Sequence, residues 1–180
     1  MKKIAMLLVA AVCSVAAWAT DYTGALTVTV NGNSSSQATT ITINKEANGT
    51  YDFLLKNFVL EAGGQKMGVG NIELKGLNGT TAYGFTTVTY NDSVQISAGD
   101  DASISTWLGP LLGKVPVRLT SQFNDQAMNV TIDIDMQSTL QQTIKVGFIG
   151  TTPAVLAGDV NGDGKVSLPD VTALVNLLLQ

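Results

Sequence analysis

The sequence predicts an all-β protein: an antiparallel barrel of about eight strands, followed by a short calcium loop and helix. The first observation is an alternation of apolar and polar residues with a period of two between residues 20 and 150, which buries one face of a strand and leaves the other in water. The second is the recurrence of Asn-Gly pairs between the alternating runs, at 31–32, 48–49 and 78–79. The third is an acidic loop with calcium-ligand spacing that begins at Asp159.

The alternating runs divide the body, residues 20–150, into about eight strands. They lie near residues 24–30, 38–46, 50–60, 66–77, 81–90, 114–123, 127–137 and 142–149. Asn and Gly tolerate the positive φ angles of tight hairpins, so the connections, including Gly63-Gly64 and Asn124-Asp125, should be short and antiparallel. About eight such strands can close into a small barrel without free edges.

Residues 1–19 have the three parts of a secretory signal peptide. Two lysines come first, the apolar run Ile4–Val12 follows, and Ala17-Trp18-Ala19 has the small residues that signal peptidase accepts. The mature chain is therefore expected to begin at Thr20. We expect it to be exported beyond the inner membrane, to the periplasm, the cell surface or the extracellular medium.

Two other interpretations of this segment are weaker. The apolar run is shorter than the roughly 20 residues that a membrane-spanning helix requires, so no integral membrane segment is expected. Cys13 resembles a lipoprotein anchor, but Val12 precedes it where a small residue is usual. Cleavage after Ala19 removes the single cysteine, which excludes disulfides and a thiol nucleophile from the mature chain.

The composition excludes several classes of protein. The chain contains no histidine, which excludes a histidine-based triad, a histidine proton relay and an imidazole zinc site. The formal net charge is −4, and loss of Lys2 and Lys3 with the signal peptide lowers it to −6. A mildly acidic protein is a poor partner for nucleic acid or an anionic membrane, so neither is expected.

Residues 91–113 interrupt the alternation and should form a short helix or a lid. They contain Trp107, the one tryptophan that remains after signal cleavage. Because Leu108, Leu111 and Leu112 follow it closely, we expect the tryptophan to plug one end of the barrel. Contact with a bound ligand is the alternative.

Five short segments of the body together resemble the calycin-like β-barrel family of secreted bacterial proteins. They are Tyr-Thr-Gly at 22–24, Leu-Lys-Asn-Phe at 55–58, Gly-Asn-Ile at 70–72, Trp-Leu-Gly-Pro at 107–110 and Ile-Asp-Ile-Asp-Met at 132–136. The resemblance covers nearly all of residues 20–150 and implies an eight-stranded barrel and export, but no catalytic residues. The first strand lacks the Gly-x-Trp of true lipocalins, so ligand carriage is not inherited from them.

Candidate catalytic groups in the body are few. Asp133 and Asp135 lie two positions apart on one strand, so their carboxylates should share a solvated face instead of facing each other across a substrate, as a glycosidase requires. Asp100 and Asp101 follow a glycine in a loop, where aspartate forms turns. Arg118 should point outward, where it can pair with an acid of a neighbouring strand. An enzyme acting on glycans is therefore a weaker hypothesis than a binding or assembly protein or a carrier of a small ligand.

Residues 159–170 have the spacing of a calcium-binding loop. Calcium prefers about six to eight oxygen ligands, supplied in such loops by positions one, three, five, seven, nine and twelve. Those positions hold Asp159, Asn161, Asp163, Lys165, Ser167 and Asp170, of which Lys165 would contribute its backbone carbonyl and Ser167 a hydroxyl or a bridging water. Gly164 at position six supplies the sharp turn. We therefore predict a Ca²⁺ site; the alternative is an acidic turn without a metal.

The loop and the helix expected after it, residues 159–180, resemble one repeat of a type I dockerin, a module that binds cohesins in a calcium-dependent manner. A linker over residues 151–158 precedes it. Ser167 and Asp170 should form a capping box at the start of the helix. An apolar helix face is formed by Leu168, Val171, Leu174, Val175 and Leu178.

A helix this short must pack on something, and a dockerin supplies a second repeat for that purpose. Here the sequence contains one repeat, so several partners stay open: a cohesin-like protein, the barrel of the same chain, or the tail of a second copy. A remnant of a truncated sequence is a further alternative. The sequence as a whole favours an exported, non-catalytic binding or assembly protein with a calcium-stabilised tail. The alternative is a lipocalin-like carrier of a small apolar ligand within the barrel.

Overall fold

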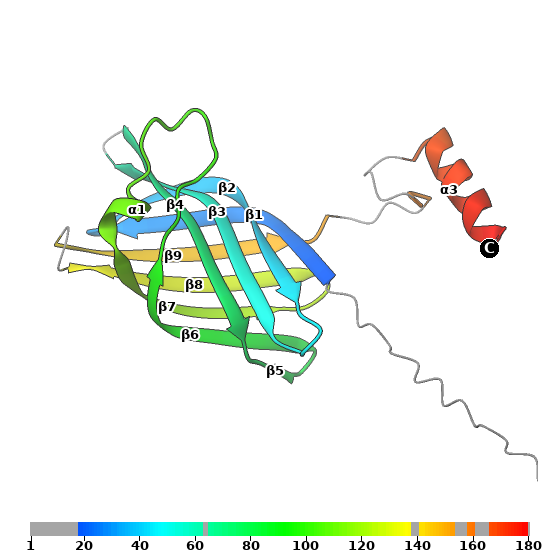
Figure 1. Ribbon diagram of the computed structural model, residues 1–180, viewed down its shortest axis with the longest axis horizontal. Coiled ribbons are helices and arrows are strands. Elements are labelled where there is room, and N and C mark those ends of the chain that lie inside the picture. Colours follow the sequence, from blue (N-terminus) through cyan, green and yellow to red (C-terminus); the bar gives the residue numbers. More distant parts are fainter. Residues whose placement is uncertain (1–17, 63–64, 138–140, 154–157, 161–165, 180) are drawn as a thin grey trace, which may run out of the picture.

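The computed structural model describes residues 18–62, 65–137, 141–153, 158–160 and 166–179. Its strands are β1 (Trp18–Val30), β2 (Asn33–Lys45), β3 (Tyr51–Ala62), β4 (Gln65–Leu77), β5 (Gly79–Ala82), β6 (Phe85–Gln95), β7 (Lys114–Phe123), β8 (Ala127–Met136) and β9 (Gln142–Thr151). The helices are α1 (Gly109–Leu112) and α3 (Leu168–Leu178). The strands form one antiparallel sheet in the order β4-β3-β2-β1-β9-β8-β7-β6-β5, which curls on itself (Figure 1). The predicted all-β class with a short terminal helix is confirmed.

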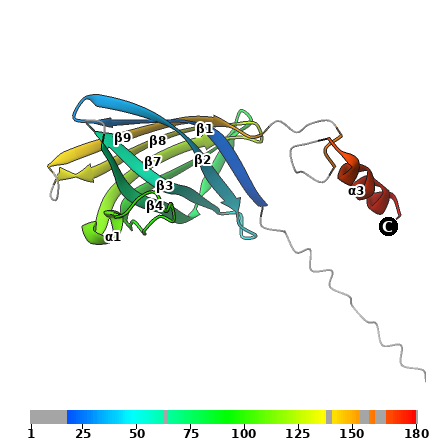
Figure 2. The same ribbon diagram turned by 90° about the horizontal axis from the view of Figure 1, so that it is seen from above.

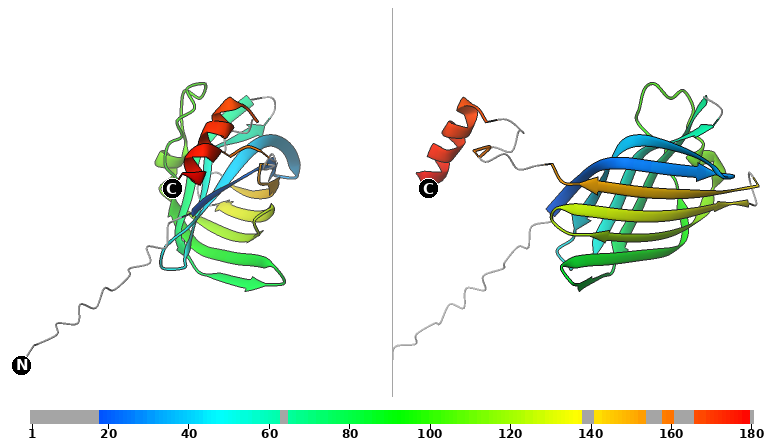
Figure 3. Two further views of the ribbon diagram at one scale, coloured as in Figure 1. Left: turned by 90° about the vertical axis from the view of Figure 1, so that its right-hand side faces the viewer. Right: turned by 180° about the vertical axis from the view of Figure 1, so that it is seen from behind.

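The sheet curls around a core of buried apolar side chains, and Figure 3 shows the curl from its end. The short β5 has no buried residue. In β7 and β8, buried and exposed residues alternate over the whole strand, as the sequence pattern predicts. The largest fully buried side chains are Tyr22, Phe53, Phe58, Phe148, Leu26, Ile41, Leu55, Ile72, Leu74, Ile96, Leu119 and Met128. Burial of each such side chain stabilises the fold by roughly 1.5–3 kcal/mol, so this packed interior is the main stabilising element.

Two of the predicted turns form short antiparallel connections, of which the first has the expected positive φ angles. Asn31 and Gly32 have φ angles of 50° and 83°, the left-handed pair that a two-residue hairpin between twisted strands requires. Between β7 and β8, the Oδ1 atom of Asn124 accepts hydrogen bonds from the backbone N–H groups of Gln126 and Ala127 at 2.9 and 2.8 Å. The predicted Gly-Gly turn at 63–64 lies outside the described residues.

The predicted hairpin at Asn78-Gly79 is wrong, and the predicted strand at 81–90 is divided by a turn between β5 and β6. The chain reverses instead at Tyr83-Gly84, with φ angles of 51° and 79°, between β5 and β6. Gly79 begins β5, which pairs with β6 at the end of the sheet. Threonines on both sides of the turn continue the alternating pattern, so the sequence does not show where the strand ends. Tyrosine rarely adopts a positive φ, so Tyr83 does not indicate a turn either. Within the described residues the sheet therefore has nine strands instead of about eight, and its end strands β4 and β5 do not pair to close it as predicted.

β1 and β2 are longer than predicted. β1 begins at Trp18 instead of residue 24, and β2 begins at Asn33 instead of residue 38. The serine-rich residues 34–36 pair with Thr27–Thr29 of β1. A run of serines has neither apolar alternation nor β-branched side chains, so its strand conformation comes from its partner strand.

The segment after β6, residues 96–108, connects the end of β6 to β4. Asn71 of β4 and Ser97 exchange two backbone hydrogen bonds of 2.9 and 3.2 Å, and the Leu108 N–H donates to the Gly68 carbonyl at 2.9 Å. The predicted interruption at residues 91–113 is thus shorter, because β6 continues to Gln95. The short helix expected there is α1.

In the tail, α3 lies apart from the curled sheet (Figures 1 and 3). Its predicted capping box is confirmed: Ser167 and Asp170 each accept a hydrogen bond from the backbone N–H of the other. The apolar side chains of α3 stay accessible, with Leu174 and Leu178 exposed by 43% and 75%. Neither described helix combines the length and the apolar character needed to cross a membrane.

Candidate functional site

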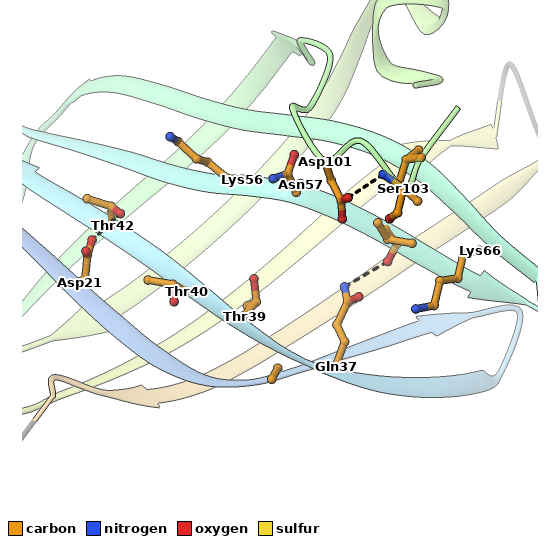
Figure 4. A pocket seen from close by; sticks show the side chains of 13 residues that line it. Asp21, Gln37, Thr39, Thr40, Thr42, Lys56, Asn57, Lys66, Asp101 and Ser103 are labelled. Carbon is orange, nitrogen blue, oxygen red and sulfur yellow. Dashed lines mark hydrogen bonds between the residues drawn. The ribbon is translucent and has the colours of Figure 1, made fainter. Parts of the chain in front are cut away.

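A groove of about 520 Å³ lies where β2 and β3 separate (Figure 4). The two strands pair only between Ile41–Lys45 and Tyr51–Leu55. Outside this ladder, β2 stays paired with β1, and β3 stays paired with β4. In Figure 2 the β1–β2 hairpin accordingly curves away from the β3–β4 hairpin. The groove is lined by side chains of β1 to β4 and of the segment after β6, most of them hydroxyl, amide or charged.

A β-bulge at Asn57 accounts for the separation. The pairing of β3 with β4 shifts register between Leu55 and Phe58, and Asn57 has a φ of 52°. Leu55 and Phe58 are both buried although they are three positions apart, which a regular strand with a period of two does not allow. Because Asn57 is one extra residue in β3, the side chain of Phe58 points into the core again. The bulge also bends β3 away from β2. The change of spacing in the apolar pattern at 55–58 was the sequence signal for this feature, and the alternation analysis missed it.

A network of polar side chains fixes the bulge. The Asn57 backbone N–H donates to Asn71 Oδ1 at 2.8 Å, and Asn71 Nδ2 donates to the Ala98 carbonyl at 2.9 Å. Asn57 Nδ2 donates to Asp100 Oδ1 at 2.7 Å, while the Asp100 N–H donates back to Asn57 Oδ1 at 2.8 Å. One wall of the groove is therefore held in place by bonds between segments far apart in the sequence.

The charged groups of the groove are two aspartates and two lysines. Asp21 accepts a hydrogen bond of 2.6 Å from the Thr42 hydroxyl. The Ser103 backbone N–H, at 2.9 Å from Asp101 Oδ1, lowers the pKa of Asp101, and the Ser103 hydroxyl and the charge of Lys66 act in the same direction. Asp101 therefore forms the turn that the sequence predicts and stays ionised. Lys56 and Lys66 complete the set of charges.

Trp107 lies against β4. It forms a parallel bridge with Gly68, and a β-carbon placed on Gly68 or Gly99 would collide with its indole ring. These glycines let the segment after β6 approach β4 closely. Of the leucines expected to help plug the barrel, Leu112 packs against the core, whereas Leu111 is 75% exposed and does not.

The outer face of β7 to β9 carries the aspartates weighed as a catalytic pair. Asp133 and Asp135 flank the fully buried Ile134, so both carboxylates point away from the core, as expected. Asp133 lies opposite Arg118 of β7 and Lys145 of β9 in the ladders. This arrangement is a charged strand face and gives no facing pair of carboxylates across a substrate site.

An aromatic pocket of about 330 Å³ lies at one mouth of the curled sheet, at the start of β1 and the end of β7. The Phe123 ring contacts those of Tyr22 and Tyr51, with centroid distances of 6.3 and 5.4 Å. Trp18 also lines this pocket and is 69% exposed. The sequence pattern gave no indication of this cluster because its members come from separate strands.

Three of the six predicted calcium ligands lie outside the described residues: Asn161, Asp163 and Lys165. Of the others, Asp170 is 2% exposed, and its Oδ1 accepts a hydrogen bond from the Val160 N–H at 2.9 Å. Its Oδ2 accepts one from the Ser167 N–H at 2.6 Å. Through these two hydrogen bonds Asp170 holds Val160, which follows Asp159 at the start of the predicted loop, close to the end of the loop.

Of the comparisons with known proteins, the family model agrees with this architecture. No curated protein and no solved structure matches the chain. The family model for the calycin-like beta-barrel domain matches residues 18–151, from the first residue of β1 to the last of β9. This match covers well over half of the sequence, and the chain belongs to the calycin-like beta-barrel domain family.

Proposed function

We propose that this chain is an exported, non-catalytic binding or assembly protein, in which the barrel binds a ligand and the tail folds around Ca²⁺ to attach to a partner. A calycin-like fold is compatible with a binding or carrier role. The observation that carries the proposal is the contrast between the interior of the described sheet, which is apolar apart from the buried Ser121, and a polar, preorganised groove between β2 and β3. Such a groove offers hydrogen bonds and charges to a ligand without a nucleophile or a general base poised for reaction.

The chemistry of the tail supports the calcium part of the proposal. Asp159, Ser167 and Asp170 are hard oxygen donors, which is the ligand type that Ca²⁺ prefers. The hydrogen bonds of Asp170 to both ends of the loop favour the closed shape that a calcium loop needs. When bound, the ion would offset the mutual repulsion of the acidic side chains.

Limited proteolysis of the whole mature chain, with calcium and with chelator, tests the tail. Chelation should expose residues 159–179 to protease and leave β1 to β9 protected, because the proposed ligands lie beyond the sheet. Asp159→Ala should mimic chelation, whereas Asp133→Ala, which removes an outward strand aspartate, should not. Equal protection of the tail in both conditions would make the loop an acidic turn.

Attachment is tested separately from calcium binding. An immobilised cohesin module and analytical ultracentrifugation of the protein alone, each with calcium and with chelator, distinguish a cohesin-like partner from a second copy of the tail. Calcium-dependent binding in one of the two assays supports the proposal. A monomer that binds no cohesin in either condition contradicts the attachment role.

A second candidate function, carriage of a small apolar ligand, is favoured by the aromatic pocket at the mouth of the sheet. Its rings from Tyr22, Tyr51 and Phe123 provide an apolar surface at the entrance to the interior. Native mass spectrometry of protein purified from its host would detect a retained ligand. Saturable binding of a hydrophobic probe that is lost in Phe123→Ala would favour the carrier over the attachment role.

A further inference from the structure

Where β2 and β3 separate, the edge of each strand that faces the other has no ladder partner among the described residues. On one side of the groove lie residues 33–40 of β2, and on the other residues 56–62 of β3, because the ladder between the strands stops at Ile41 and Leu55. Their opposite edges pair with β1 and β4. An open strand edge presents a row of N–H and C=O groups that can pair with another chain.

The two edges are bridged by a side chain where a ladder would join main chains. Gln37 Nε2 donates to the Val59 carbonyl at 3.1 Å (Figure 4). Paired strands lie about 4.8 Å apart and bond directly, so a bridge through a glutamine side chain places these main chains farther apart than paired neighbours. An extended peptide is the ligand that presents N–H and C=O groups at strand spacing on both of its sides.

The bulge keeps the edges from closing on each other. Asn57 directs β3 away from β2, and its bonds to Asn71 and Asp100 tie that direction to β4 and to the segment after β6. The separation is therefore part of the fold, and an incoming strand would not have to break an existing ladder.

The charges of the groove favour one kind of side chain on the incoming strand. Asp21 already accepts a hydrogen bond from Thr42, and Asp101 accepts one from Ser103. Within the described residues, the one ion pair shorter than 4.0 Å joins Lys75 to Glu73, so Lys56 and Lys66 have no carboxylate at that distance. Lys66 lies opposite Glu61 in the β3–β4 ladder and acts on Asp101 through its charge, but neither lysine is held in an ion pair among the described residues, so both can bind an acidic side chain. The lining contains no aromatic ring on which a sugar could stack.

We propose that the groove binds an extended peptide carrying an acidic side chain, which adds as a strand between β2 and β3 and displaces the bridge from Gln37. This inference rests on the proposed binding role of the barrel and names the class of its partner. It is independent of the calcium tail. Main-chain hydrogen bonds to the two edges supply affinity. Lys56 and Lys66 lie at opposite ends of the groove, so the lysine that the acidic residue reaches supplies the preference for it.

The test is a titration of the isotope-labelled mature protein with a peptide of about eight residues, alternating Thr and Val with one central Glu, followed by amide chemical shifts. The expected shifts lie at residues 33–40 and 56–61. The same peptide N-methylated at alternate residues should bind at least about tenfold more weakly, because it cannot donate to one edge. A peptide with Gln in place of Glu should also bind more weakly.

Charge variants give a matched control. Lys56→Gln combined with Lys66→Gln should weaken the Glu peptide about tenfold and leave the Gln peptide unchanged. Lys145→Gln, on the outer face of β9, removes the same charge elsewhere and should change neither. Equal affinity of the methylated and unmodified peptides would overturn the proposal, as would shifts confined to the aromatic pocket. In that second case, or if oligosaccharides alone moved the groove amides, a binding role for the barrel would stand without a peptide.

Discussion

Asn57 and Asp100, 43 positions apart in the sequence, hold each other by two hydrogen bonds. The side-chain amide of Asn57 donates to the Asp100 carboxylate at 2.7 Å, and the Asp100 backbone N–H donates to the amide oxygen of Asn57 at 2.8 Å. Since Asn57 is the bulged residue of β3, this pair connects the bend that opens the groove to the segment that closes the sheet against β4.

Asn57→Ala should lower the free energy of unfolding by about 2–4 kcal/mol, because it removes these hydrogen bonds and places alanine at a φ of 52°. Asn57→Gly loses the same bonds but adopts this φ easily, so its loss should be about 1 kcal/mol smaller. Urea unfolding followed by Trp107 fluorescence measures both. Equal losses in the two variants would mean that the left-handed conformation is not maintained.

The stability should fall at alkaline pH because of Tyr22. Burial, with a smaller contribution from Asp125, raises the pKa of Tyr22 to about 12 from its usual 10.0. The neutral hydroxyl donates to the Asn124 carbonyl at 2.7 Å, and the residue is 2% exposed. The folded pKa lies above the unfolded one, so this stabilisation is complete below pH 10 and is lost as the pH rises through 12.

Urea midpoints between pH 9 and pH 12 should therefore show a loss of about 1–2 kcal/mol in the wild-type protein that Tyr22→Phe lacks. Tyr83→Phe is the matched control, because the Tyr83 side chain is fully exposed. This control should retain the wild-type pH dependence. A Tyr22→Phe profile parallel to that of the wild type would refute the assignment to Tyr22.

The β5–β6 hairpin should be improved by Tyr83→Asn. Tyr83 has a φ of 51° and precedes Gly84, so asparagine would create the Asn-Gly pair preferred in such turns. We expect a gain of about 0.5–1 kcal/mol in the free energy of unfolding, and a loss of similar size for the β-branched Tyr83→Val. Thermal unfolding of the three proteins checks this. A destabilised Asn variant would show that the Tyr83 ring contributes packing.

The mature protein should begin at Thr20, and the removal of Trp18 and Ala19 should leave the core intact. These two residues pair with Lys45 and Asn44 at the end of β1, and both side chains are exposed. The intact mass of protein from the native host gives the start of the chain. A lipid-modified product that begins at Cys13 would contradict the signal-peptide prediction.

Local patterns were sufficient for much of the fold. The alternation at 114–123, 127–137 and 142–149 predicts β7, β8 and β9 to within two residues at their ends, because burial with a period of two depends only on consecutive residues. The Asn31-Gly32 hairpin follows from the φ preferences of two adjacent residues. The capping box of α3 likewise depends on a spacing of three positions, between Ser167 and Asp170.

The groove was decided by the tertiary structure. Its two sides are a serine-rich strand without a pattern of its own, held by β1, and a bulge at Asn57, held by Asn71 and Asp100. The hairpin at Tyr83-Gly84 was also decided by the tertiary structure, since the turn is defined only by the pairing of β5 with β6. A sequence records the preferences of each residue and its neighbours. Which strand edges stay open depends instead on hydrogen bonds between residues far apart in the chain, and these exist only once the sheet has formed.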